Sequence, residues 1–252
     1  MKLHKLLLGV AAAGICALPT VASAQLIEEW DYTVNASWQN WTPADVVTNE
    51  QVGNEDVLRW GTETTGQESN LRVTRNINGT IETNSDVGGA GATITHNNFP
   101  IIGPSLTGTD LRVDVSFTPS GGTGEEGFIQ TFFIDFDETE NTAPCLPNSI
   151  SVCDDIFILN NPEELSVDFV RDNFLYTATL TFGDFFGGQI FFDDVDGDGT
   201  AELYFLTQEG LTSVLETRIL ITAQQIPEPG ALALLGAGIA GLGFAARRRR
   251  KA

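Results

Sequence analysis

Residues 110–118 read Asp-Leu-Arg-Val-Asp-Val-Ser-Phe-Thr, and their strict alternation of apolar and polar side chains decides the fold class. A β-strand points successive side chains to opposite faces, so this pattern predicts a half-buried strand. Its buried face would hold Leu111, Val113, Val115 and Phe117.

The same alternation recurs at 174–182 and 213–222. Further strand candidates lie at 31–39, 71–76, 92–95, 128–137, 156–159, 189–192 and 201–205. Glycine-rich turns separate these segments, and one short helix is predicted to begin at Asn161, which Pro162 follows. About ten strands with polar turns predict an all-β fold, an antiparallel β-sandwich or jelly-roll-like single domain over residues 25–226.

The first 24 residues have the three parts of an export signal. Lys2 and Lys5 give a positive start, residues 6–18 form an apolar core, and residues 22–24 read Ala-Ser-Ala before Gln25. A core of about 13 apolar residues is too short to cross a bilayer, which takes about 20 residues in a helix. We therefore expect a cleaved signal peptide over residues 1–24.

The C-terminal segment 227–252 also has three parts. Pro227, Glu228 and Pro229 precede an apolar run at 230–246, and four arginines and a lysine follow it. The run is at the short end of the range for a membrane-spanning helix, and the basic cluster should stay on the cytoplasmic side. A permanent single-span anchor is the alternative that this pattern leaves open.

This tail resembles the PEP-CTERM sorting signal of Gram-negative bacteria. The resemblance implies processing by exosortase, a membrane peptidase. It also implies delivery through the export machinery to the cell surface or the extracellular polysaccharide matrix. Contact with the membrane would be limited to the C-terminal sorting helix.

The segment between the two signals is strongly acidic. Residues 25–226 hold six arginines and no lysine against 33 acidic residues, a formal net charge of −27. A nucleic-acid-binding face needs Lys and Arg, so nucleic acid is excluded as a partner. Anionic polymers would bind only through bridging cations, although general solubility explains the charge equally well.

Two cysteines remain after the signal, Cys145 and Cys153, with seven residues between them. An even pair in an exported chain predicts a disulfide that closes a small local loop. A zinc site is disfavoured because two further ligands are missing and His96 is the sole histidine of this segment.

The strongest candidate metal site is an acidic loop at 194–202. Oxygens at alternating positions of a tight loop can converge on one hard cation, and Gly199 permits the sharp turn. The candidate ligands are Asp194, Asp196, Asp198, Thr200 (through its carbonyl) and Glu202. Phe205 stands where an EF-hand has Glu, so we expect weak calcium binding of the extracellular type, on the order of 10⁻⁴–10⁻³ M. A solvated acidic turn is the alternative.

A second acidic patch follows the apolar run at 132–134. It consists of Asp135, Asp137, Glu138 and Glu140. Paired carboxylates can act as acid and base in glycoside hydrolysis, but the sequence supplies no sign of a pocket. We expect these residues to form a solvated strand end.

Thr95, His96 and Asn98 form a short motif at the end of a predicted strand. Together with the Pro-Glu-Pro tail and the chain length, it resembles the THxN family of PEP-CTERM proteins, a resemblance that implies no reaction or ligand. A single histidine without a partner carries little chemistry, so we expect His96 and Asn98 to form structural hydrogen bonds.

The sequence has four tryptophans, namely Trp30, Trp38, Trp41 and Trp60. Exposed tryptophans could stack on sugar rings, but tryptophan is more commonly buried in the core. The motifs of nucleotide-binding proteins, serine hydrolases and zinc proteases do not occur. The sequence favours a non-enzymatic structural or adhesive surface protein, with calcium as its bridge to extracellular polysaccharide. A glycan-binding module is the alternative, and a polysaccharide-cleaving enzyme is less favoured.

Overall fold

A computed structural model describes residues 25–63, 66–140, 145, 148–151, 153–194, 202–227 and 238–239. The predicted signal peptide lies outside the described residues, as does almost all of the predicted sorting helix. Within the described part of the chain, no helix has both the length and the apolar character needed to cross a bilayer.

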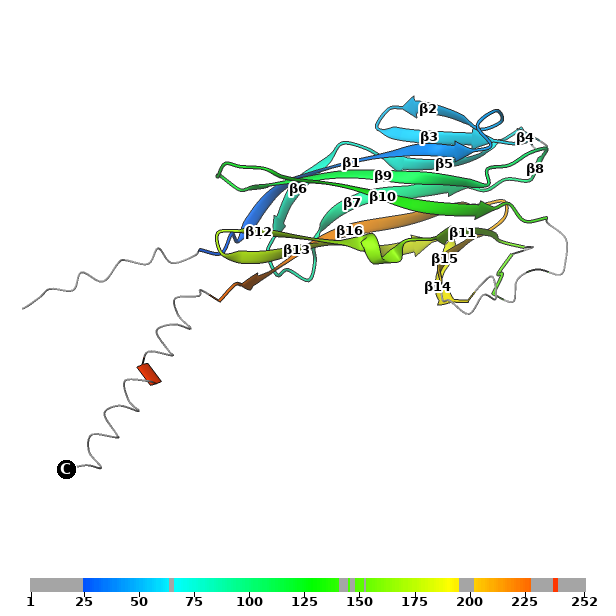
Figure 1. Ribbon diagram of the computed structural model, residues 1–252. Coiled ribbons are helices and arrows are strands. Elements are labelled where there is room, and N and C mark those ends of the chain that lie inside the picture. Colours follow the sequence, from blue (N-terminus) through cyan, green and yellow to red (C-terminus); the bar gives the residue numbers. More distant parts are fainter. Residues whose placement is uncertain are drawn as a thin grey trace, which may run out of the picture.

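The fold is a sandwich of two seven-stranded antiparallel sheets (Figure 1). The strands of the first sheet are β1 (Glu29–Thr42), β6 (Ile77–Glu82), β9 (Gly108–Pro119), β10 (Glu126–Asp137), β11 (Asp155–Leu159), β14 (Gly188–Asp193) and β15 (Glu202–Thr207). They lie in the order β14-β15-β11-β10-β9-β1-β6.

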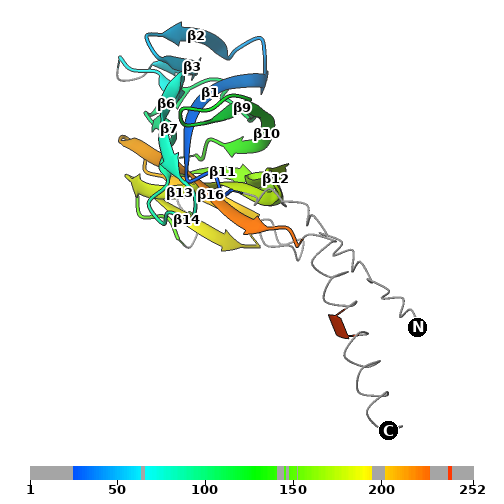
Figure 2. The same ribbon diagram turned by 90° about the vertical axis from the view of Figure 1, so that its left-hand side faces the viewer.

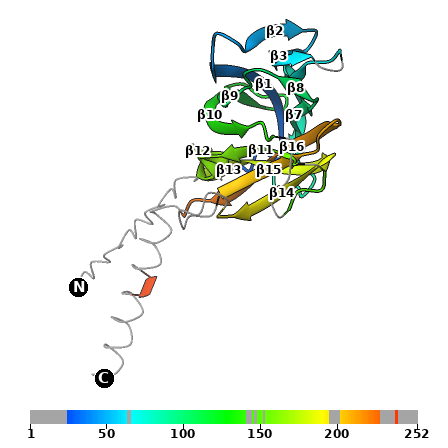
Figure 3. The same ribbon diagram turned by 90° about the vertical axis from the view of Figure 1, so that its right-hand side faces the viewer.

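The strands of the second sheet are β2 (Thr48–Val52), β3 (Glu55–Trp60), β5 (Ser69–Thr74), β7 (Gly89–Asn97), β12 (Ser166–Arg171), β13 (Phe174–Phe186) and β16 (Thr212–Gln225). Their order is β12-β13-β16-β7-β5-β3-β2. A small pair joins β4 (Thr62–Glu63) to β8 (Ile101–Ile102), and η1 (Pro162–Leu165) is a single 3₁₀ turn. Views along the sandwich place β2 on one side of the molecule and β14 on the opposite side (Figures 2 and 3).

Strand β1 shows why this sequence folds as a sandwich. Alternate residues from Trp30 to Trp38 are buried, and the residues between them face outward or are only half-buried. β1 pairs with β6 on one side and β9 on the other, so its backbone N–H and C=O groups form hydrogen bonds with neighbouring strands. Its inner face packs in the core.

Two aromatic clusters fill the core toward opposite ends of the long strands. Strand β10 contributes Phe128 to the first cluster and Phe136 to the second. The first cluster also contains Trp30, Phe117, Phe169 and Tyr176, and the second contains Trp60, His96 and Phe157. Edge-on and stacked ring contacts of this kind add to the free energy of burying the rings.

The chain enters and leaves the sandwich at the end marked by the Trp30 cluster (Figure 1). The backbone N–H of Ile27 donates to the hydroxyl of Tyr176, and the backbone N–H of Ile226 donates to the carbonyl of Asn173. The sorting tail that begins at Pro227 therefore leaves from this end, and the Trp60 cluster lies toward the other.

The predicted all-β sandwich is confirmed. Each of the ten predicted strand segments falls on an observed strand, although 201–205 includes one residue outside the described part. The sequence pattern does not predict six of the observed strands, namely β2, β3, β4, β6, β8 and β12. The predicted short helix is a one-turn 3₁₀ segment, and Asn161 does not cap it. Its side chain instead accepts from Phe133 N and donates to the carbonyl of Thr131 on β10.

Candidate functional site

The acidic loop at 194–202 connects two neighbouring strands. β14 and β15 form an antiparallel pair in which Asp193 lies opposite Glu202. Asp194 is exposed and Glu202 is half-buried, whereas Asp196, Asp198 and Thr200 lie outside the described residues. The structure therefore places the flanks of the predicted calcium loop at a hairpin, and the arrangement of its ligands stays a prediction.

In the sorting motif, Pro227 is described, and Glu228 and Pro229 lie outside the described residues.

Cys145 and Cys153 are joined by a disulfide with an S–S distance of 2.08 Å. The segment beside it is organised by Asp154, whose carboxylate accepts from the backbone N–H groups of Ile150 and Ser151. Ser151 in turn accepts from the backbone N–H of Glu209 at 3.0 Å. The disulfide segment is thus connected to the turn that follows β15.

His96 and Asn98 lie deep in the structure, whereas Thr95 is half-buried. The His96 ring lies 2.9 Å from the Thr207 hydroxyl through Nδ1, and the Asn98 amide donates to the Thr207 carbonyl at 3.4 Å. Both residues therefore connect β7 to β15 in the opposite sheet. Burial lowers the pKa of His96 to about 3, so the ring is neutral at physiological pH.

Three of the four tryptophans are buried in the core, namely Trp30, Trp38 and Trp60. Trp41 is half-buried and packs against the same core. The pair of exposed indoles that a stacking glycan site would need is therefore not present among these four residues.

The acidic patch after β10 is solvated only in part. Asp135, Asp137 and Glu140 are exposed, as predicted. The prediction was wrong for Glu138, whose side chain turns inward because the next layer of the sandwich offers it a donor: the indole N–H of Trp60, 2.8 Å from Oε2.

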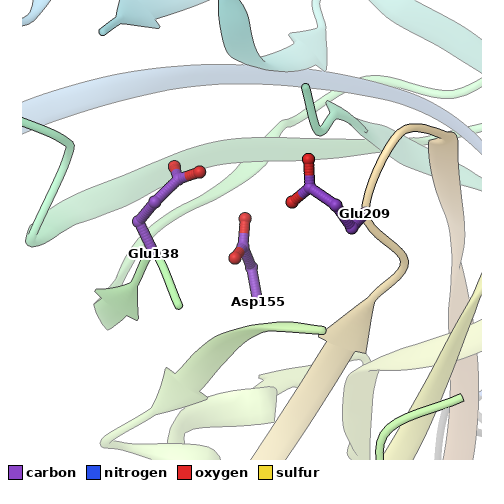
Figure 4. A group of neighbouring side chains, drawn as sticks. All are labelled: Glu138, Asp155 and Glu209. Carbon is purple, nitrogen blue, oxygen red and sulfur yellow. The ribbon is translucent and has the colours of Figure 1, made fainter. Parts of the chain in front are cut away.

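Glu138 belongs to a cluster of three carboxylates, which we call the carboxylate cluster: Glu138, Asp155 and Glu209. Each offers one oxygen, and these oxygens all lie within 4.8 Å of one another. The three side chains come from different segments, after β10, at the start of β11 and after β15, and Asp155 lies between the other two (Figure 4).

Asp155 is fully buried, at 0 % exposure. Its Oδ1 accepts from the backbone N–H of Thr139 at 3.0 Å, and its Oδ2 has no hydrogen-bond partner. Burial raises the pKa of Asp155 to about 9, and the like charges of Glu138 and Glu209 add to this effect.

Burial likewise raises the pKa of Glu138 to about 7, with the Trp60 hydrogen bond acting in the opposite direction. Such a cluster can either hold protons or give its oxygens to a hard cation.

Sequence reasoning missed this cluster because its members are far apart in the chain. The sequence predicts Glu138 only as part of a solvated patch, and no local motif distinguishes Asp155 or Glu209 from other acidic residues. The available signal was the position of Asp155, two residues before Phe157 on the inner face of a predicted strand.

An apolar cavity of about 80 Å³ lies between the sheets. Aliphatic and aromatic side chains dominate its walls, including Trp38, Leu111, Phe132 and Phe205. A sugar needs convergent polar groups, so this cavity does not fit a glycan. The carboxylates of the cluster are not part of its walls.

No curated protein and no solved structure matched the chain. One family model matched, described as the PEP-CTERM protein-sorting motif, and it covers residues 225–250. The match includes Pro227, Glu228, Pro229, the apolar run and the arginine block. The chain therefore carries a PEP-CTERM sorting motif, which marks an exported protein that exosortase recognises and processes.

Proposed function

We propose that this protein is a non-enzymatic structural or adhesive component of the outer surface or extracellular polysaccharide matrix of a Gram-negative bacterium. In this role, calcium joins its acidic body to acidic polysaccharide. The observation that carries the proposal is an acidic β-sandwich fused to an exosortase sorting motif.

The charge of the sandwich supports a bridging role for cations. Its six arginines face 33 acidic residues, so most carboxylates have no basic partner within the chain. Four arginines are already paired with acids; the pairs are Arg59–Glu50, Arg72–Glu55, Arg112–Asp114 and Arg171–Glu126. Two anionic polymers repel each other unless a divalent cation lies between them.

The end of the sandwich from which the chain continues into the sorting tail also supports this role. Ile226, the residue before the sorting motif, is held to Asn173 at the Trp30 end of the sandwich, and we infer that a membrane-held precursor presents the opposite end to the exterior. The hairpin of β14 and β15 carries the predicted calcium loop on an edge of the first sheet. Asp194 at the start of that loop is exposed, and a cation bound there can share its open coordination positions with a second polymer.

The two alternatives have less support. A glycan site built on stacked indoles lacks exposed tryptophans. Glycoside hydrolysis needs two carboxylates in a cleft that admits a sugar, and the carboxylates of the cluster do not line the cavities between the sheets.

The test is co-sedimentation of the exported protein, purified from a host with the exosortase machinery, with the extracellular polysaccharide of that host. We expect the protein to sediment with the polymer in calcium and to stay in solution in excess chelator. The double substitution Asp196→Asn and Asp198→Asn should weaken sedimentation, while Asp168→Asn and Asp184→Asn, which change the net charge equally, should not. Sedimentation that is unchanged by chelator contradicts cation bridging, and no sedimentation in either condition contradicts the matrix role.

A further inference from the structure

We propose that Glu138, Asp155 and Glu209, together with Asn98, form a calcium-binding site at the end of the sandwich remote from the sorting tail. This site is separate from the loop at 194–202, and the inference does not depend on the surface role proposed above.

The donor set favours a hard cation. All three side chains offer carboxylate oxygens, and these oxygens lie within 4.8 Å of one another. Two oxygens bonded to one calcium ion at about 2.3–2.6 Å can be at most about 5.2 Å apart, whereas about 4.2 Å is the limit for magnesium at about 2.0–2.1 Å. The observed limit lies inside the calcium span.

An independent observation comes from the second sheet. Asn98 is fully buried, and its Oδ1 has no hydrogen-bond partner. Its amide nitrogen donates to the Thr207 carbonyl, and Thr207 is the register partner of Asp155. The Asn98 amide is thus held beside the backbone that leads to Glu209, and an amide oxygen is an ordinary calcium ligand.

The burial of Asp155 also indicates a bound cation. Its Oδ2 lacks a hydrogen bond, and its side chain lies between those of Glu138 and Glu209 (Figure 4). Buried polar atoms without partners are rare, and an ion is one of the accepted reasons for them. The three carboxylates are groups of like sign whose oxygens lie within 4.8 Å of one another. A divalent cation would relieve this repulsion.

A cation at this site would connect four segments that come from both sheets. Glu138 follows β10, Asp155 begins β11, Glu209 follows β15, and Asn98 follows β7 of the facing sheet. The disulfide segment is tied to the same place through Ser151 and Glu209. Calcium would therefore stabilise this end of the sandwich as a unit, because it binds the folded arrangement and not the unfolded chain.

Trp60 offers a specific probe. Its indole N–H donates to Glu138 at 2.8 Å, so a terbium ion in place of calcium would lie close to an indole that can transfer excitation to it. We would titrate the exported protein with terbium, excite tryptophan selectively, and then compete with calcium. The thermal midpoint in calcium and in chelator gives a second readout that needs no fluorophore.

The test variant is Asp155→Asn, which keeps the side-chain shape and removes one charge. We expect at least a tenfold loss of terbium and calcium affinity and loss of the calcium-dependent rise in thermal midpoint. Asp184→Asn is the matched control, because Asp184 is exposed and remote from the cluster in sequence. If Asp155→Asn does not fold, Glu209→Gln serves as the second variant.

The outcomes separate this site from the loop and from the proposed function. Loss of the terbium signal in Asp155→Asn, with the signal kept in the Asp196→Asn and Asp198→Asn double variant, supports the site. An unchanged terbium signal in Asp155→Asn overturns the proposed site. A thermal midpoint of the wild-type protein that is the same in calcium and in chelator also overturns it. Neither readout involves polysaccharide, so failure of the matrix role leaves this result standing.

Discussion

The ring of His96 lies nearly parallel to the indole of Trp60, with ring centroids 5.6 Å apart and 18° between the ring planes. Phe136 and Phe157 contact the same imidazole edge-on from the first sheet. The motif histidine is therefore a core aromatic residue, held by three rings and by the hydroxyl of Thr207. This environment explains why the ring stays neutral: a charged imidazolium would lose its hydration without gaining an acidic partner.

His96 should make the protein sensitive to acid. Its pKa is lowered to about 3 in the folded protein from an ordinary 6.5, so the unfolded chain takes up the proton first. The stability that depends on neutral His96 is present above about pH 6.5 and is lost as pH falls toward about 3. In His96→Phe this component should disappear, and the variant should lose less free energy of unfolding than wild type between neutral pH and about pH 4.

Urea unfolding at both pH values measures this difference. At neutral pH, His96→Phe should be less stable by about 1–3 kcal/mol, since the Thr207 hydroxyl loses its partner. Thr207→Val combined with His96→Phe should recover part of that loss. An acid-induced loss equal to that of wild type would show that another group is responsible.

The carboxylate cluster predicts the opposite pH dependence in the chelated protein. The pKa of Asp155 is raised to about 9 from 3.8 and that of Glu138 to about 7 from 4.5, both chiefly by burial. The folded protein therefore holds protons that the unfolded chain releases, and stability falls as pH rises from about 4 through about 9.

Asp155→Asn tests this expectation, because an amide cannot titrate. In chelator, the variant should be as stable as wild type at low pH and more stable than wild type near pH 9. Chemical unfolding across the pH range gives the comparison. If the free energy of unfolding changed with pH in the same way in both proteins, a buried and protonated Asp155 would be contradicted.

Gly89 is required by the packing of Tyr32. A Cβ atom added at Gly89 would lie 2.7 Å from Cε1 of the buried Tyr32 ring, whose hydroxyl donates to the Ala90 carbonyl. Gly89→Ala should lower the free energy of unfolding by about 1–3 kcal/mol through overpacking. Gly127→Ala on β10 is the control, because a Cβ there meets nothing within 4 Å, and its effect should stay within about 0.5 kcal/mol. Similar effects of the two substitutions would be inconsistent with this packing.

The disulfide between Cys145 and Cys153 closes a short loop, with a sequence separation of 8. The chain-entropy estimate for so small a loop is about 2.5 kcal/mol, so replacing both cysteines by serine should lower the free energy of unfolding by about that amount. Thr139 donates to the Cys153 carbonyl and, through its backbone N–H, to Asp155. Calcium affinity should therefore fall in the same variant, and calorimetric titration against wild type would detect it. Unchanged affinity would show that the cluster is held without the disulfide.

Strands with one buried face could be predicted from the sequence because their apolar and polar side chains alternate. β1 and β9 are of this kind. Strand β3 was missed because Asp56, Val57 and Leu58 are consecutive buried residues, and β2 was missed because it is exposed along its whole length. Neither strand shows the alternation of buried and exposed residues that identifies a half-buried strand.

The carboxylate cluster could not be predicted for a different reason. Its geometry depends on the pairing of β11 with β15 and on the crossing of Trp60 from the other sheet, contacts between residues far apart in the chain. Local pattern predicts that acids after a strand are solvated, which holds for Asp137 and Glu140. Glu138 differs because the sandwich supplies a donor and a neighbouring carboxylate.

The most direct test of the central claim is an anomalous difference map from crystals of the exported protein grown with terbium. We expect a peak bonded to oxygens of Glu138, Asp155 and Glu209 at about 2.3–2.6 Å, with the Asn98 amide oxygen turned toward it. A second peak in the 194–202 loop would be compatible with that result. A map with terbium only in that loop, or with an ordered empty carboxylate cluster, would contradict the account.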